Sequence, residues 1–152
     1  AGAGVTMENP DIRNMIAQAG LPLENIELLG EVDDMDAFYK NIDILVLSSR
    51  TEGFPNVIVE AMNHGKPVVS SDVGDAAAII GETGTVVPAG EPEALARGIA
   101  GMLNLSPAAY TSLSAAAADR VRAHFSLQEC AIQYRAFLER RSTSHCCGTS
   151  GS

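Results

Sequence analysis

Short apolar runs alternate along the chain with segments whose apolar residues recur at helical spacing. The runs have the length and β-branched content of buried strands, and they occupy residues 26–29, 43–48, 67–71 and 84–87. The periodic segments predict helices over residues 10–20, 34–41, 55–64, 91–104 and 107–123, with a single turn near 76–79. Ser126 is expected to cap a last helix that runs to about residue 140. This alternation indicates an α/β fold with a doubly wound parallel sheet, followed by C-terminal helices.

The segment after the second of these strands places two glutamates eight positions apart. Glu52 follows the carboxyl end of the strand, where open α/β sheets bind ligands. Glu60 lies about one turn into the next helix, where a carboxylate can accept hydrogen bonds from the vicinal hydroxyls of a ribose. The turn between them, Gly53-Phe54-Pro55-Asn56, leads into a helix N-terminus that offers N–H groups and a positive dipole end to an anion. The arrangement can hold a sugar nucleotide.

A plainer interpretation of the same segment stays open at this point. Acidic residues in the first turn of a helix often only complement the helix dipole, which would account for Glu60. Gly53 can supply a turn conformation without any ligand.

Length, composition and charge bound the remaining function classes. A chain of 152 residues with 46% hydrophobic content can bury one core, so we expect one domain over residues 1–140. The segment 141–152 is rich in Ser, Thr and Gly and is expected to be disordered. The net charge of −9 argues against nucleic acid and anionic membranes as partners. No apolar stretch reaches membrane-spanning length, and no leader pattern opens the chain, so a cytoplasmic protein is expected.

The three cysteines are too few for a disulfide scaffold. Cys130 falls on the apolar stripe of the last predicted helix and is expected to be a small buried hydrophobe. Cys146 and Cys147 adjoin His145, but adjacent cysteines lack the spacing of a zinc site. We therefore predict no metal site.

Four segments together resemble the C-terminal, donor-binding half of a GT-B glycosyltransferase, and more narrowly the retaining group 1 family of bacterial sugar transferases. These segments are Glu52–Met62, Gly65–Val69, Asp72–Asp75 and Thr83–Gly84, and the runs Leu28–Val32 and Gly90–Leu95 fit the same family. The resemblance extends from about residue 4 to about residue 138. It implies a Rossmann-like domain and a reaction that moves a sugar from a nucleoside diphosphate sugar to an acceptor hydroxyl with retention of configuration. The donor is a substrate, so no cofactor is implied.

The resemblance also implies roles for particular residues. Glu60 would bind the ribose hydroxyls, and Glu52 would lie against the hydroxyls of the transferred sugar near the reacting centre. The backbone of Gly53, Phe54, Pro55, Asn56 and Val57 would face the sugar and the diphosphate, and the loop from Gly30 to Val32 would lie beside the nucleobase. The family normally grips the diphosphate with an Arg–Lys pair that precedes this sequence. Arg50 is a candidate substitute for that pair, and an exposed loop arginine is the alternative.

Compared with the family, the chain lacks the N-terminal acceptor-binding domain and the first, central strand of the donor domain, so the resemblance implies a domain truncated at its N-terminus. To fill the gap in the sheet we expect a remnant strand in residues 1–6, a changed strand order, or a second copy of the chain as a homodimer partner. Three functions remain open. The first is the donor half of an enzyme, inactive without an acceptor domain. The second is a stand-alone nucleotide-sugar binding module, and the third is a fragment that oligomerises without catalytic activity.

Overall fold

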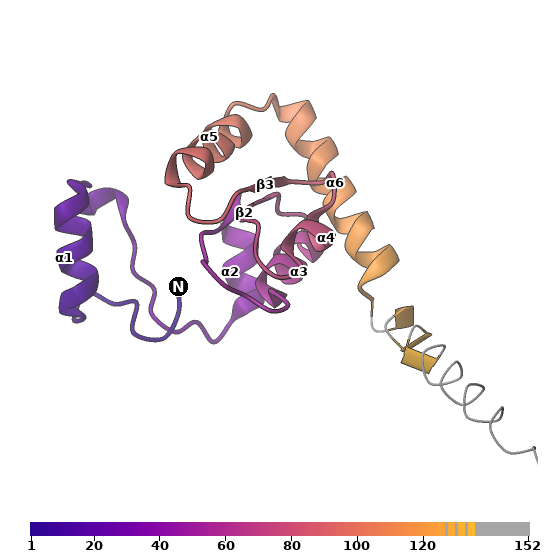
Figure 1. Ribbon diagram of the computed structural model, residues 1–152, viewed down its shortest axis with the longest axis horizontal. Helices are drawn as coiled ribbons and strands as arrows, with labels where there is room; N and C mark the ends of the chain where they lie inside the picture. The colour runs from indigo at the N-terminus through magenta and orange to yellow at the C-terminus, as the bar shows by residue number, and fades with distance from the viewer. Residues whose placement is uncertain (127, 130, 133, 136–152) are drawn as a thin grey trace, which may run out of the picture. The chain divides into compact units, whose positions relative to one another are not determined.

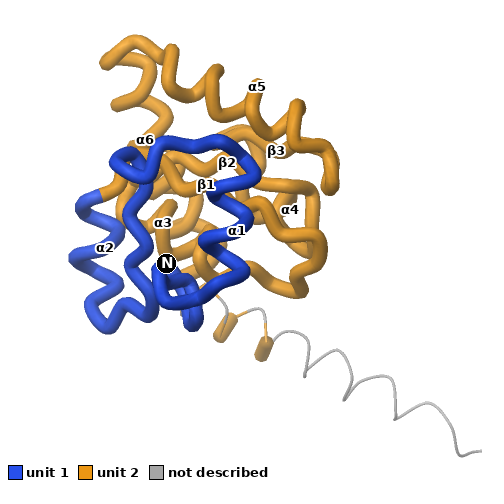
Figure 2. Tube along the Cα trace, turned by 90° about the vertical axis from the view of Figure 1, so that its left-hand side faces the viewer, with its two compact units in different colours: residues 1–41 blue, residues 42–152 orange. Residues whose placement is uncertain are grey.

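A computed structural model describes residues 1–126, 128–129, 131–132 and 134–135. The chain divides into two compact units, residues 1–41 and the residues from 42 onward, which Figure 2 shows in different colours. Cys130, Cys146, Cys147 and the predicted tail at 141–152 lie outside the described residues.

The first unit contains α1 (Pro10–Ala19), the short 3-10 helix η1 (Leu23–Asn25) and α2 (Met35–Asn41). The side chain of Asn9 caps α1 by accepting a hydrogen bond from the Asp11 N–H at 3.0 Å, and the left-handed Gly20 ends the helix. Asp34 caps α2, because its Oδ1 accepts a hydrogen bond from the Ala37 N–H at 2.9 Å. Both predicted helices of this unit are confirmed.

The predicted strand at residues 26–29 is wrong. A strand exists only where a neighbour pairs with its backbone, and these residues carry no ladder of such bonds. Just after them, the Gly30 N–H donates to the Val5 carbonyl at 3.0 Å and the Gly30 carbonyl accepts from the Gly2 N–H, but these bonds do not form a strand. Residues 1–6 likewise form no strand, so the predicted remnant strand is also absent.

The second unit is built around a three-stranded parallel sheet of β1 (Leu45–Leu47), β2 (Val68–Ser71) and β3 (Thr85–Val87). The spatial order β1-β2-β3 follows the sequence, so the expected change of strand order does not occur within the described residues. Pairing through a second copy of the chain stays a prediction. The strands at 43–48, 67–71 and 84–87 were expected and are confirmed, each shortened at its ends.

Four helices accompany the sheet: α3 (Asn56–Asn63), α4 (Ala76–Ile80), α5 (Pro92–Leu103) and α6 (Pro107–His124). In Figure 1, α5 lies on one side of the strands, and α3 and α4 lie on the other. This is the α/β arrangement that the alternating pattern predicts. After α6, the Ser126 Oγ accepts a hydrogen bond from the Glu129 N–H at 3.2 Å, which confirms the start of the last predicted helix.

The core of the second unit lies where β2 passes between these helices. Val68, Val69 and Ser70 in β2 are all fully buried, as expected for the central strand of a sheet covered on both faces. From α3 and α4 the core receives Ile58, Met62, Ile79 and Ile80, and from α6 it receives Ala117 and Val121. None of the helices in the described part of the chain is long and apolar enough to cross a membrane.

Helix α6 is held against the rest of the unit by side chains that bond to distant backbone carbonyls. Near its start, the Tyr110 hydroxyl donates to the Asp43 carbonyl at 2.8 Å. Burial, and then the negative charge of Asp43, raise the pKa of the Tyr110 hydroxyl. Further along, the Ser114 hydroxyl donates to the Gly65 carbonyl. Near its end, Arg120 donates to the carbonyls of Ile79 and Ala78, at 2.7 Å each.

The paired hydrogen bonds of Arg120 predict a stability effect. Carbonyls at the end of α4 lack partners within their own helix, so Arg120→Met leaves them unsatisfied and lowers the free energy of unfolding by about 2 kcal/mol. Urea denaturation measures this loss. Arg122→Met is the matched control, because Arg122 forms an ion pair with the exposed Asp119 and its loss costs at most about 0.5 kcal/mol. Equal losses for the two variants would contradict the assignment.

Candidate functional site

The loops that follow β1, β2 and β3 all lie at one edge of the sheet, because the carboxyl ends of parallel strands meet there. A cavity of about 200 Å³ opens at this edge. Its lining comes from the loops after β1 and β3, from the last residue of β2 and from the start of α5, and consists of Ser48, Arg50, Ser71, Gly90, Glu91, Pro92 and Leu95. Concave sites at this edge are where α/β sheets bind ligands.

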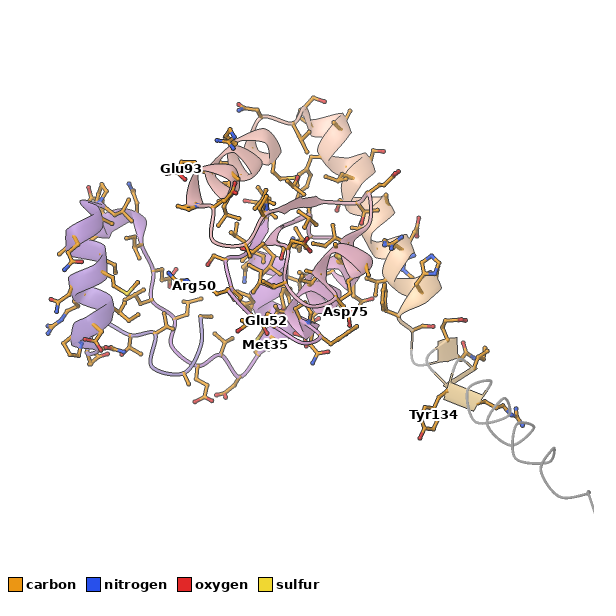
Figure 3. All side chains as sticks on the ribbon, in the orientation of Figure 1. Met35, Arg50, Glu52, Asp75, Glu93 and Tyr134 are labelled. Atoms are coloured by element: carbon orange, nitrogen blue, oxygen red, sulfur yellow. The ribbon has the colours of Figure 1, made fainter. Side chains whose placement is uncertain are left out.

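Glu52 lies in the loop after β1 and presents an exposed carboxylate. The Ser49 hydroxyl donates to its Oε1 at 2.7 Å, which restricts the orientation of the carboxylate from within the same loop. In Figure 3, Arg50 and Glu52 extend from this loop, whereas Asp75 comes from the loop after β2 and Glu93 from α5. The loop therefore carries a cation and a hydrogen-bond acceptor two residues apart.

The loops after β1 and β2 touch through their backbones. The Asp75 N–H donates to the Gly53 carbonyl at 3.1 Å. Gly74, in the loop after β2, has a φ of +50°. A Cβ atom at this position would lie 1.9 Å from the backbone oxygen of Gly53 and 2.6 Å from that of Glu52. Only glycine allows such an approach. The position of the Glu52–Gly53 turn therefore depends on a residue 21 positions further along the chain, from Gly53 to Gly74.

The turn leads directly into α3. Pro55 is the N-cap, and its side chain provides no capping hydrogen bond. The first-turn N–H groups of Asn56 and Val57 therefore face outward with the positive end of the helix dipole, a combination that attracts anions. The buried face of α3 carries Ile58, Ala61 and Met62.

Glu60 lies on the exposed face of α3, four residues after Asn56. Residues four apart on a helix are neighbours on its surface, so the Glu60 carboxylate lies one turn below the outward-facing N–H groups. The His64 Nδ1 lies 3.1 Å from the Glu60 carbonyl oxygen and joins the backbone at the end of the helix. The helix therefore offers an anion-attracting end and, one turn away, an acceptor suited to hydroxyl groups.

Eight of the ten residues predicted for the site belong to the second unit: Arg50, Glu52, Gly53, Phe54, Pro55, Asn56, Val57 and Glu60. The other two, Gly30 and Val32, belong to the first unit, where Gly30 is buried and has a φ of +61°. Within the described ranges, no three His, Cys, Asp or Glu side chains come together as a metal ion would require.

Sequence reasoning did not select Ser49 or Ser71, although both stand where an apolar run ends. The transition from a strand to small polar residues was the signal that could have identified them. It also did not select Gly74 for the site, because a sequence motif does not show which backbone approaches a glycine.

A sequence profile of the family described as "Glycosyl transferases group 1" matches residues 1–104. The lipopolysaccharide core biosynthesis mannosyltransferase LpcC of Rhizobium leguminosarum bv. viciae is 41% identical over 115 residues, which are 74% of this chain and 32% of that protein. The phosphatidyl-myo-inositol mannosyltransferase of Mycobacterium leprae is 38% identical over 98 residues, 61% of this chain and 26% of that protein. The chain thus spans about a quarter to a third of the length of these relatives.

Solved structures show the same fold. The sucrose-phosphate synthase of Thermosynechococcus elongatus superposes with a TM-score of 0.76 at 28% identity, over 90% of this chain and 35% of that one. Anabaena HepE in complex with UDP and glucose gives a TM-score of 0.77 at 25% identity, over 91% of this chain and 39% of that one. The C-terminal domain of the group 1 protein LpcC from Francisella tularensis gives a TM-score of 0.64 at 21% identity, over 80% of this chain and 66% of that one. This likeness supports the fold alone.

The contact at Gly74 predicts that its substitution displaces the turn. In Gly74→Ala the alanine must adopt a left-handed backbone conformation, and its Cβ overlaps the Gly53 carbonyl oxygen. Together these two effects lower the free energy of unfolding by about 3 kcal/mol. Gly90→Ala is the control, because Gly90 also has a positive φ but has nothing within 4 Å of its added Cβ. Its cost is therefore about 1 kcal/mol. Thermal or urea unfolding of both variants measures the difference, and similar values would show that the backbone contact contributes nothing.

Proposed function

Because the chain belongs to the group 1 family of glycosyltransferases, we propose that it is the donor-binding half of a glycosyltransferase. The reaction moves a sugar from a nucleoside diphosphate sugar to an acceptor hydroxyl, with retention of the anomeric configuration. The observation that carries this proposal is the segment from Glu52 to Glu60. It combines two exposed carboxylates with an uncapped helix N-terminus at the ligand-binding edge of a parallel sheet.

The helix α3 supports the assignment of the nucleotide. Its N-terminal N–H groups at Asn56 and Val57 attract the diphosphate, while Glu60 accepts hydrogen bonds from the two ribose hydroxyls. Pro55 fixes the backbone at the helix entry without competing as a donor. Gly30 and Val32 stay the candidates for the nucleobase that the family resemblance implies.

The loop after β1 supports the assignment of the sugar. The Glu52 carboxylate, oriented by Ser49, accepts hydrogen bonds from hydroxyls of the transferred sugar, and the open backbone at Gly53 lets that sugar approach the Gly53 and Phe54 N–H groups.

As the glycosidic bond breaks, negative charge develops on the departing diphosphate. The α3 dipole and the Arg50 guanidinium stabilise this charge, which lowers the barrier to transfer. No carboxylate is assigned as a covalent nucleophile.

Two comparisons support the class of donor. HepE was solved in complex with UDP-glucose, and it matches 86% of this chain with a TM-score of 0.74. The curated relatives include mannosyltransferases of lipopolysaccharide and of phosphatidyl-myo-inositol. The chain spans about a third of such proteins, so we propose that the acceptor binds to a second domain that faces the loop after β1.

The ribose contact predicts the effect of a single carboxylate. Glu60→Gln removes the charged acceptor of two hydrogen bonds and weakens nucleotide binding by about 10- to 100-fold. Calorimetric titration with UDP, GDP and ADP, and with their sugars, measures this loss and identifies the base. Glu93→Gln, in the first turn of α5, makes the same charge change away from the segment and retains wild-type affinity. The proposal fails if the wild-type chain binds none of these ligands at millimolar concentration.

The role of Glu52 is tested by turnover. A coupled assay for released nucleoside diphosphate is run with the chain alone and with an acceptor domain from a relative, supplied in trans. We expect release only with the acceptor domain, and a decrease of about 100-fold in Glu52→Gln at nearly unchanged nucleotide affinity, because its contacts strengthen as the sugar is transferred. Binding without turnover under either condition would leave a stand-alone nucleotide-sugar binding module as the function.

A further inference from the structure

The backbone contacts with the loop after β2 fix one side of the Glu52–Gly53–Phe54 turn. On that side, Gly53 contacts the loop after β2, through the Asp75 N–H and the absent side chain of Gly74. On the other side, the Phe54 ring extends from the turn and keeps 48% of its surface exposed. A ring this exposed contributes little to the core, so its orientation depends on whatever it touches.

Phe54 touches Phe125, the C-cap residue that directly follows α6. The two ring centroids lie 6.2 Å apart and the ring planes meet at 53°, within the range in which aromatic pairs attract one another. The residues are far apart in sequence, so the contact joins the end of the last long helix to the turn after β1. The ring of His124 lies 6.4 Å from that of Phe125.

Phe125 is itself held in place. Its backbone N–H donates to the Val121 carbonyl at 2.8 Å, which closes the last turn of α6. Val121 is buried, and the neighbouring Arg120 bonds to the carbonyls at the end of α4. The Phe125 ring is therefore attached to a helix end whose position the core determines. It can serve as a fixed support for the exposed Phe54 ring.

We propose that Phe125 is a positioning residue for the sugar end of the donor site. It does not touch the ligand itself, and acts by holding Phe54 and thereby the N–H groups of Gly53 and Phe54 in the orientation that binds the transferred sugar. The inference rests on the proposed function, because the ligand of those N–H groups is the nucleoside diphosphate sugar. Without Phe125 the turn samples other orientations, and binding must first order it.

Two different effects follow for the two parts of the ligand. The ribose contact comes from Glu60, which is fixed by the buried face of α3 and not by the turn. The sugar contact comes from the turn. Loss of Phe125 therefore weakens binding of the nucleoside diphosphate sugar and leaves binding of the corresponding nucleoside monophosphate nearly unchanged. A general loss of stability would weaken both equally.

The test compares Phe125→Ala with wild type, with Phe125→Tyr, which keeps an aromatic ring, and with Tyr134→Ala. Tyr134 is 67% exposed, so its truncation matches the loss of an aromatic ring without removing the contact with Phe54. Two quantities are measured on the full chain: amide hydrogen exchange without ligand at Asp75, whose N–H donates to the Gly53 carbonyl, and calorimetric affinity for the nucleoside monophosphate and the nucleoside diphosphate sugar.

In Phe125→Ala we expect exchange of the Asp75 N–H, which is bonded to the turn, and the dissociation constant of the nucleoside diphosphate sugar to rise about two- to tenfold. Phe125→Tyr and Tyr134→Ala are expected to behave as wild type. Unchanged exchange of the Asp75 N–H overturns the proposal, as does faster exchange with unchanged affinity for the nucleoside diphosphate sugar. Equal weakening of both ligands assigns Phe125 a structural role only and also overturns it. If the wild-type chain binds no nucleotide, the proposed function fails, and the exchange measurement still decides whether Phe125 positions the turn.

Discussion

The direct backbone contact between the loops after β1 and β2 is the constraint on which the rest of the site depends. Parallel strands bring these loops to one edge, but adjacency alone does not fix a turn. The missing side chain at Gly74 lets the Gly53 carbonyl come close enough to accept the Asp75 N–H. This fixes the direction in which the chain enters α3, and with it the place of Glu52 before the helix.

The charge of the chain and the charge of its proposed ligand have the same sign, and local structure resolves the conflict. A net charge of −9 repels an anionic donor at long range, but physiological salt screens charges beyond about 8 Å. Within that distance the ligand meets the positive end of α3 and the Arg50 side chain. The dipole is a property of the backbone, so attraction of the diphosphate depends less on the basic side chains than a count of Lys and Arg suggests.

Local signals in the sequence predicted most of the helices, and relations between distant residues account for what it missed. Ser126 was sufficient to place the start of the last helix, because a cap bonds to a residue only three positions away. The run at 26–29 has a strand's composition, but composition does not supply the neighbour with which a strand must pair. The spacing of Glu52 and Glu60 was visible in the sequence. The contacts of Gly74 with Gly53 and of Phe125 with Phe54 were not visible, because each joins segments that lie far apart in the sequence.

The two ends of α6 respond differently to alkali. The Tyr110 hydroxyl near the start of the helix has a raised pKa, so it donates to the Asp43 carbonyl at neutral pH and loses this bond only when the phenol ionises, above its ordinary value near 10. The bonds near the other end run from the Arg120 guanidinium to carbonyls of α4 and do not involve the phenol. Alkaline unfolding of α6 should therefore begin at the end remote from the Glu52 turn and reach the Phe125 end last.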